Sequence, residues 1–195
     1  MAQNILHNEV RFNDYEFAVN YRKKHLKMAV NFADEYKYKL VKKDFAKGRI
    51  LDAGCGFGET LIKLGDYFTE SELYGIDLSE SFITMANEGK IGKGLNERVN
   101  FQKADIHRIP FPNNFFEVII NTNMLHIVED PVLMLNEIER VLSPTGIFLI
   151  ADIKKSFLGI VEKEIRSALT ETELTEITSK SVLRKGNVKT GLLST

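Results

Sequence analysis

Residues 49–58 read Arg-Ile-Leu-Asp-Ala-Gly-Cys-Gly-Phe-Gly, a short apolar run that ends at an acid and is followed by a glycine at every second position. A helix-compatible segment, Glu-Thr-Leu-Ile-Lys-Leu at 59–64, comes next, so the pattern predicts strand, turn and helix. The glycines remove side chains from one side of the turn, so a ligand can lie against the backbone above the helix N-terminus. They are Gly54, Gly56 and Gly58.

A second apolar run, Leu-Tyr-Gly-Ile at 73–76, ends at Asp77. A carboxylate at the end of the second strand of such a unit can accept two hydrogen bonds from the vicinal hydroxyls of a ribose. The glycine turn and this acid together predict a pocket for a nucleoside.

The residues around the turn distinguish two kinds of nucleoside cofactor. The dinucleotide fingerprint needs a third small residue three positions after its second glycine, and that position holds Glu59. Asp52, two residues before the first glycine, would repel a pyrophosphate but suits a cationic amino group. A nicotinamide-dependent oxidoreductase therefore stays as a weaker alternative, and a cationic ligand is favoured.

The same residues resemble the first motif of the class I S-adenosylmethionine-dependent methyltransferases, acid-x-Gly-x-Gly-x-Gly, at Asp52, Gly54, Gly56 and Gly58. The resemblance implies S-adenosyl-L-methionine as the cofactor. It also implies that the methionine part lies along the glycine turn and that Asp77 holds the ribose.

Length and composition bound the class of protein. A chain of 195 residues fits one domain, and no apolar run approaches the ~20 residues that span a bilayer. The single cysteine, Cys55, excludes an intrachain disulfide, and the N-terminus is polar rather than signal-like. We expect a cytoplasmic protein without a membrane part. A net charge of −1 is far from the basic surplus of nucleic-acid-binding proteins, so no nucleic-acid partner is expected.

Strand-like and helix-like segments alternate along the chain from residue 49, with short turns between them. This alternation predicts an α/β fold, a doubly wound and mostly parallel Rossmann-like sheet with right-handed crossovers. Continuous apolar runs at 118–120 and 147–150 predict strands that are buried on both faces. We expect strands at 49–52, 73–76, 99–103, 115–120 and 147–151, helices at 58–68, 79–88 and 131–142, and a turn at 143–146.

Residues 1–47 are expected to form an N-terminal helical arm, and residues 48–195 the cofactor-binding domain. Asn13 or Asp14 can cap the helix of the arm. The arm either packs its aromatic residues against the domain, which we prefer, or closes over the cofactor as a lid, from which Tyr15 and Tyr21 could reach a substrate. Its apolar stripe recurs at three- and four-residue steps and contains Ala18, Tyr21, His25, Ala29, Phe32 and Tyr36.

Polar residues follow four of the expected strands, and ligands of doubly wound sheets bind at the carboxyl ends of the strands. Asp105, after the third strand, resembles the family's acid that accepts a hydrogen bond from the adenine amino group, while the Ile106 backbone would meet the ring; a simple turn cap is the alternative for Asp105. The expected cofactor-binding residues are Asp52, Ala53, Gly54, Cys55, Gly56, Gly58, Asp77, Leu78, Asp105, Ile106 and Asn121.

The resemblance covers roughly residues 49–152. In this range the sequence is similar to the small-molecule branch of the family, which includes quinone-biosynthesis methyltransferases. The family commonly has Asp at Glu117 and Gly at Thr145, and we interpret both differences as structural. The residues that carry this part of the resemblance lie at 104–105, 109–112, 115–118, 125–126, 130–131 and 139–146.

The tail differs from the family pattern, which adds a sixth strand and an antiparallel seventh. We expect helices at 156–169 and 171–179 and a sixth strand at 188–193, after which no seventh strand follows. A missing strand would leave an edge of the sheet free, where a second copy could form a homodimer or a partner chain could complete the sheet.

Methyl transfer from a sulfonium is an in-line displacement, so the protein mainly supplies positioning and a water-poor cavity. His126, after the fourth strand, is the candidate base; bracing of its loop is the alternative. His7, His25 and His107 show no ligand spacing, so no metal is expected. Residues 121–124 lack the Asn-Pro-Pro-aromatic motif of amide and base methylation, so a small-molecule acceptor is expected. A non-catalytic cofactor-binding protein that acts with a partner chain stays as an alternative.

Overall fold

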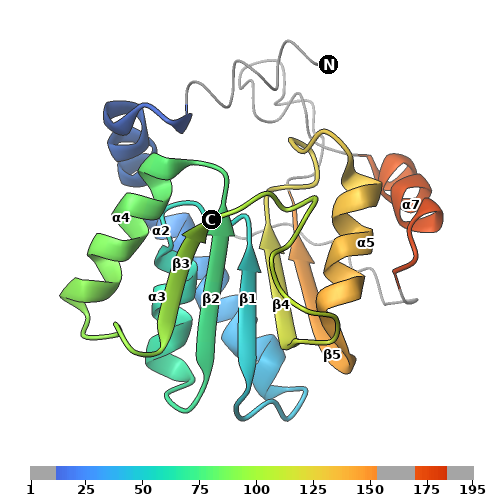
Figure 1. Ribbon diagram of the computed structural model, residues 1–195, viewed down its shortest axis with the longest axis horizontal. Helices are drawn as coiled ribbons and strands as arrows, with labels where there is room; N and C mark the ends of the chain where they lie inside the picture. The colour runs from blue at the N-terminus through green and yellow to red at the C-terminus, as the bar shows by residue number, and fades with distance from the viewer. Residues whose placement is uncertain (1–11, 153–169, 184–195) are drawn as a thin grey trace.

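The computed structural model describes residues 12–152 and 170–183, and it forms a five-stranded parallel sheet in the order β3-β2-β1-β4-β5 (Figure 1). β2 and then β3 lie on one side of β1, and β4 and then β5 lie on its other side, so the strand order reverses at β1. This is the predicted doubly wound fold. The strands are β1 (Arg49–Ala53), β2 (Glu72–Asp77), β3 (Val99–Lys103), β4 (Phe116–Thr122) and β5 (Leu142–Ala151).

Helices cover both faces of the sheet (Figure 1). Ile50 points into a core cluster with residues of α2, α3 and α4, whereas the next residue, Leu51, packs with residues of α5. Successive strand residues point to opposite faces, so an apolar run is what a strand covered on both sides requires. The helices are α2 (Tyr15–Val41), α3 (Glu59–Tyr67), α4 (Glu80–Gly92), α5 (Pro131–Val141) and α7 (Glu171–Lys180).

Four of the described helices begin at a side chain that accepts a hydrogen bond from a free backbone N–H, and the sequence predicts three of these caps. Asp14 caps α2 by accepting from the Phe17 N–H at 2.8 Å. Ser79 caps α4 and Asp130 caps α5, where Pro131 occupies the first turn. The starts of these helices are therefore fixed by local sequence.

The expected turn at 143–146 is wrong, because these residues lie inside β5 as an irregularity of the strand. Leu142 pairs with Phe116 and Ile147 pairs with Val118, so β5 uses five steps where β4 uses two. The three additional residues form a bulge. The proline and the glycine in this segment are typical of a turn, but they are equally compatible with a bulge. The predicted helix at 171–179 is present as α7, and the predicted elements at 156–169 and 188–193 lie outside the described residues.

The described part of the N-terminal arm contains one long helix, α2, which shares its core with the sheet. Phe32, Tyr36 and Leu40 of α2 are almost fully buried in the same cluster as Ile50 and Leu64. These aromatic residues of the arm therefore pack against the rest of the molecule, whereas Tyr15 and Tyr38 are exposed. Within the described residues, no helix is long and apolar enough to cross a bilayer.

Candidate functional site

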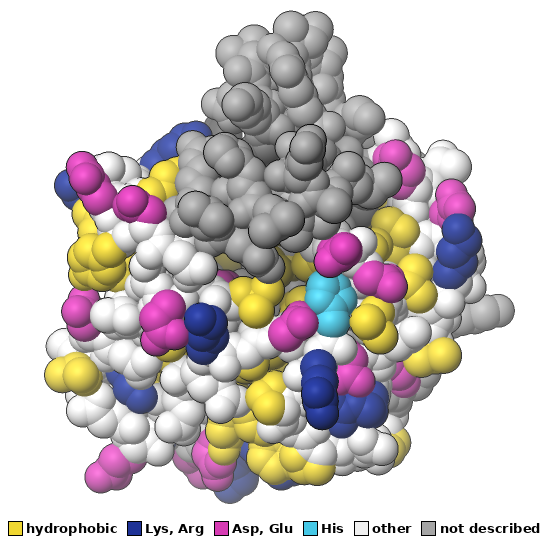
Figure 2. Space-filling view, turned by 45° about the horizontal axis from the view of Figure 1, so that its top comes forward, with side chains coloured by type: hydrophobic (Ala, Val, Ile, Leu, Met, Phe, Trp, Pro, Cys, Tyr) yellow, Lys and Arg dark blue, Asp and Glu magenta, His cyan; other side chains and the backbone are white. Residues whose placement is uncertain are grey.

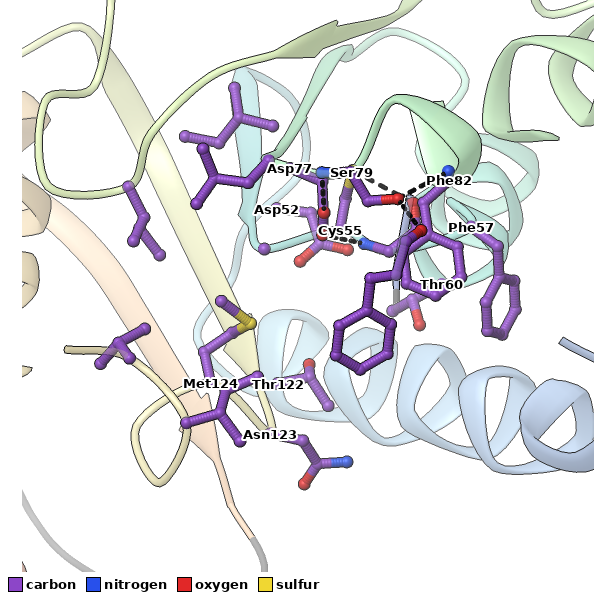
Figure 3. A pocket seen from close by; sticks show the side chains of 18 of the residues that line it. Asp52, Cys55, Phe57, Thr60, Asp77, Ser79, Phe82, Thr122, Asn123 and Met124 are labelled. Atoms are coloured by element: carbon purple, nitrogen blue, oxygen red, sulfur yellow. Dashed lines mark hydrogen bonds between the residues drawn. The ribbon is translucent and has the colours of Figure 1, made fainter. Parts of the chain in front are cut away.

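A cavity of about 440 Å³ opens at the carboxyl ends of the strands, above the point where the strand order reverses (Figure 3). Its floor comes from the end of β1, the glycine turn and the end of β2, and one wall comes from the residues after β4. Figure 2 shows this end of the molecule, with hydrophobic and acidic side chains at its surface. Eight of the expected cofactor-binding residues line the cavity: Asp52, Gly54, Cys55, Gly56, Asp77, Leu78, Asp105 and Ile106.

Asp77 is held in place by the backbone on both sides of it. Its Oδ2 accepts a hydrogen bond from the Gly56 N–H and its Oδ1 accepts one from the Ser79 N–H, both at 2.9 Å (Figure 3). Burial raises the pKa of Asp77 above its ordinary value, although these backbone hydrogen bonds lower it. The carboxylate is thereby aimed into the cavity from a rigid strand end, as a group that binds two hydroxyls must be.

Asp52 is a buried acid whose carboxylate lacks a hydrogen-bond partner at one of its oxygens among the described residues. It is only 2% exposed, and the oxygen in question is Oδ1. Burial, and then the charge of Asp77, raise the pKa of Asp52 to about 8. A buried carboxylate without a partner is costly, so the site favours a cationic ligand that would supply the missing charge.

The glycines of the turn serve two different purposes. A side chain at Gly56 would meet open space, because this left-handed residue (φ +51°) faces the cavity. A side chain at Gly58 (φ +78°) would lie 2.7 Å from Ala86 Cβ and from the Phe101 ring. Gly56 therefore leaves room for a ligand, whereas Gly58 permits close packing at the start of α3 and does not line the cavity.

Two further expected residues, Ala53 and Asn121, lie beneath the cavity rather than in its lining. The ladder between β1 and β4 ends at Asp52 and Ile120, and beyond it the Asn121 Nδ2 donates to the Ala53 carbonyl at 2.6 Å. This side-chain bond holds the two strand ends together where the backbone ladder stops. Asn121 thus shapes the floor of the cavity from below.

Asp105 and Ile106 line the end of the cavity beyond β2 and β3, together with the half-exposed Leu78. Asp105 also fixes its own loop, since its Oδ1 accepts from the His107 N–H and lies 2.9 Å from His107 Nδ1. The turn-cap role and a ligand role are compatible, because one carboxylate has several acceptor positions.

The structure does not bring His126 into the lining of the cavity. Its Nδ1 lies 2.5 Å from Asp152 Oδ1, and Asp152 Oδ2 accepts from the Leu125 N–H at 2.8 Å. Asp152 thus ties the segment after β4 to the end of β5. This contact fits the bracing alternative for His126.

One wall of the cavity comes from α2, which holds none of the expected cofactor-binding residues but does hold Tyr21, a residue that the lid alternative for the arm named. Tyr21, His25, Met28, Ala29 and Phe32 line the cavity from this helix. All of them except Met28 belong to the apolar stripe of the arm, so the three- and four-residue periodicity was the available signal. Periodicity shows which residues share a face but does not show whether that face meets a core or a cavity.

Hydrogen bonds fasten the start of the arm to the cap of α4. Ser79 Oγ donates to the Phe12 carbonyl at 2.6 Å, and Ser81 Oγ donates to the Asn13 carbonyl at 2.7 Å. Phe12 and Asn13 also line the cavity. The arm is therefore connected directly to the loop that follows Asp77.

The lining contains more acids than bases. Lys103 is the one Lys or Arg among the described lining residues, and its Nζ lies 3.5 Å from Glu80. No group of three or more His, Cys, Asp or Glu that could hold a metal ion occurs in the part of the chain that the structure describes. The acids of the lining are Asp52, Glu59, Asp77, Asp105 and Glu129.

A family model described as a methyltransferase domain matches residues 44–189, which is three quarters of the sequence. The chain belongs to the S-adenosylmethionine-dependent methyltransferase family. The methyltransferase core that the model recognises includes the glycine turn, Asp77, and the residues after β3 and β4. The predicted family, fold class and cofactor class are confirmed.

Known members of this methyltransferase family resemble the chain in sequence and in structure. It is 32% identical over 107 residues to 27-O-demethylrifamycin SV methyltransferase of Amycolatopsis mediterranei, covering 55% of this chain and 39% of that protein. It is 31% identical over 116 residues to the ubiquinone/menaquinone biosynthesis C-methyltransferase of Yersinia pestis, covering 59% and 46%. The chain thus spans less than half the length of these curated relatives.

A crystal structure of a SAM-dependent methyltransferase from Aquifex aeolicus matches with a TM-score of 0.67 and 27% identity, over 77% of this chain and 81% of that one. The predicted similarity to quinone-biosynthesis methyltransferases is confirmed by the Yersinia pestis relative.

Proposed function

We propose that this protein is an S-adenosyl-L-methionine-dependent methyltransferase that transfers a methyl group to a small-molecule acceptor. The observation that carries the proposal is that Asp52, Asp77 and the bare backbone at Gly56 face one cavity at the reversal of strand order. An adenosyl sulfonium amino acid needs three features in its site: an acid that can pair with a cation, a fixed acceptor for hydroxyls, and open space above a helix N-terminus.

The residues of the cavity fit the cofactor part by part. Asp77 would bind the ribose hydroxyls, and Asp105 with Ile106 would bind the adenine. The turn at Gly56 would lie along the methionine, and Asp52 would balance its positive charge. When bound, S-adenosylmethionine supplies an electrophilic methyl group on a cationic sulfur.

The chain's own contribution to the reaction is positioning and exclusion of water. The leaving sulfur becomes neutral as the methyl group departs in an in-line displacement, so it needs no acid from the protein. Holding two reactants in line can supply roughly 7 to 11 kcal/mol of the barrier reduction. The α2 wall, with Met28 and Phe32, supplies apolar surface that limits water beside the reacting atoms.

The acceptor is proposed to be a small molecule rather than a nucleic acid. The cavity is enclosed by α2 on one side and by residues 122–129 on another, and its lining is more acidic than basic. A polyanion would find little positive charge there. The names of two relatives refer to a rifamycin and to quinones, which supports an acceptor with a carbon-rich body.

Two alternatives are less well supported. A nicotinamide cofactor would place its pyrophosphate against Asp52 and would meet Glu59 where a small residue is required. A non-catalytic cofactor-binding protein is compatible with the cavity, but the family match favours a transferase.

Calorimetric titration with S-adenosylmethionine, S-adenosylhomocysteine and NADH tests the cofactor. We expect both adenosyl compounds to bind and NADH not to bind. Incubation with a labelled methyl donor and a metabolite extract then tests turnover: a labelled small product is expected, and binding without any labelled product would favour the non-catalytic alternative.

A cytoplasmic location and a homodimer through the edge of β5 are further proposals. Cys55 is buried as a free thiol, which suits a reducing compartment. Among the described residues, β5 is the outermost strand on its side of the sheet, so its edge could pair with a second copy. Sedimentation equilibrium should give twice the chain mass, and a monomer at all concentrations would exclude the dimer.

A further inference from the structure

We propose that His25, on the N-terminal helix α2, is the base that takes the proton of the methyl acceptor. The inference rests on the proposed methyltransferase function and assigns a catalytic residue that is different from the one the sequence suggested. His25 lines the cavity that the cofactor would occupy, although the sequence places it outside the methyltransferase core that starts at residue 44.

The three described histidines have different positions relative to the cavity. His126 is outside the lining and contacts Asp152. His107 lines the adenine end, where its Nδ1 contacts Asp105 and its Nε2 accepts from the Asp130 N–H at 3.4 Å. His25 lines the cavity from α2, a wall that holds none of the residues assigned to the ribose, the adenine or the methionine, so it is the histidine left to contact an acceptor.

The position of His25 is defined by packing. The residue is 9% exposed, and its ring lies 4.2 Å from the Tyr21 ring, centroid to centroid. One turn later, the Ala29 carbonyl accepts a hydrogen bond from Thr60 Oγ1 at 3.2 Å, which fixes this part of α2 against α3. A base must be held within reach of the proton that it takes, and a residue on a packed helix meets that condition better than one on a loop.

The cavity that His25 lines contains carboxylates that can stabilise an imidazolium. Asp52 and Asp77 lie on the sheet side of the same cavity, and Glu129 lies after β4. Glu59, at the start of α3, also lines the cavity but is paired with Arg22 of α2 at 3.3 Å. The cavity therefore has carboxylates on several sides that can stabilise one positive charge.

The proposed step balances in charge and in atoms. His25 accepts the proton of the acceptor's O–H or N–H, and the acceptor's oxygen or nitrogen bonds to the methyl carbon. The carbon–sulfur bond breaks with its electron pair on sulfur, which leaves S-adenosylhomocysteine, the methylated acceptor and an imidazolium. The positive charge passes from sulfur to His25, so the net charge facing Asp52 stays the same throughout.

Nuclear magnetic resonance of the histidine rings in the full chain tests this placement without a known acceptor. The imidazole of His25 is titrated in the complexes with S-adenosylmethionine and with S-adenosylhomocysteine, which differ only by the methyl group and its positive charge. If His25 faces the sulfur, its pKa should be lower in the first complex by about one pH unit or more. The His25→Gln variant assigns the resonance, and His107 and His126 serve as internal controls with smaller differences.

Equal pKa values of His25 in the two complexes would overturn the inference while leaving the cofactor assignment intact. A larger difference at His107 than at His25 would also overturn it, as would a His25 ring that stays neutral between about pH 5 and 9 in the S-adenosylhomocysteine complex, since such a ring cannot take a proton. Failure of either adenosyl compound to bind would overturn the proposed function, and this inference with it.

Discussion

The hydroxyl of Tyr36 lies 2.8 Å from Thr122 Oγ1 and donates to the Asn121 carbonyl at 3.3 Å, which joins the N-terminal helix to the end of β4. Tyr36 is fully buried, and burial raises the pKa of its hydroxyl far above the ordinary value, so it remains protonated. Thr122 lines the cavity, and the contact therefore couples the arm to the wall of the site.

Replacing Tyr36 by Phe should lower the free energy of unfolding by about 1 to 3 kcal/mol, because the two hydrogen bonds of its buried hydroxyl are lost while the ring stays in place. Urea denaturation measures this change. Tyr38→Phe is the matched control on the same helix, because Tyr38 is 57% exposed and should change stability very little. Equal stability of the two variants would contradict the structural role of the Tyr36 hydroxyl.

Replacing Asp77 by Ala should weaken binding of S-adenosylmethionine by about 1 to 3 kcal/mol, since the ribose hydroxyls would lose their acceptor and the Gly56 N–H would lose its partner. Titration calorimetry gives the dissociation constant. Asp66→Ala is the control, because Asp66 lies on α3 outside the cavity lining and should leave the affinity unchanged. An Asp77→Ala variant with unchanged affinity would count directly against the ribose assignment.

The affinity for S-adenosylmethionine should rise with pH up to about 8 and then level off. The pKa of Asp52 is about 8 in the free protein, so below that pH the cation must displace a proton from the acid. One released proton increases the affinity by up to about tenfold per pH unit. Calorimetry in buffers of different ionisation heats counts the protons that are released, and the Asp52→Asn variant should release fewer.

The raised pKa of Asp52 also predicts that the contribution of this residue to the stability of the cofactor-free protein falls as the pH rises. An unfolded Asp has a pKa of about 4, so between about pH 4 and 8 the folded state holds a proton that the unfolded state has lost. The contribution of Asp52 to the free energy of unfolding decreases through this window. Asp52→Asn should remove that part of the pH dependence in thermal unfolding, and an identical pH profile in the variant would show that Asp52 ionises normally.

The glycines at 56 and 58 should respond differently to replacement by Ala. Both have a left-handed backbone that costs about 1 to 2 kcal/mol with a side chain present. Gly58→Ala adds overlap with Ala86 and Phe101, for a total of about 2 to 5 kcal/mol in stability.

Gly56→Ala should cost less stability but should weaken cofactor binding by about tenfold or more, because its methyl group enters the cavity. Thermal unfolding and calorimetry on both variants separate the two effects. The assignment of Gly56 to the ligand fails if its Ala variant binds S-adenosylmethionine as tightly as the unchanged protein.

The fold could be predicted from local patterns because each strand and helix depends on neighbours in sequence. Alternating glycines after Asp52, caps such as Ser79 and Asp130, and apolar runs such as 118–120 indicated the elements and their parallel order. The bulge in β5 could not be distinguished from a turn, since its proline and glycine suit both, and only the pairing with β4 reveals it.

The amino-acid sequence by itself determined the doubly wound parallel class of the sheet, the cofactor class and the acids at the strand ends, because topology forces the ends of parallel strands to one edge of the sheet. Only the tertiary structure decided which glycine of the turn borders open space, that His126 contacts Asp152, and that His25 lines the cavity. These features depend on how α2 and the segment after β4 pack across the sheet, and contacts between segments so far apart in the chain leave no local pattern.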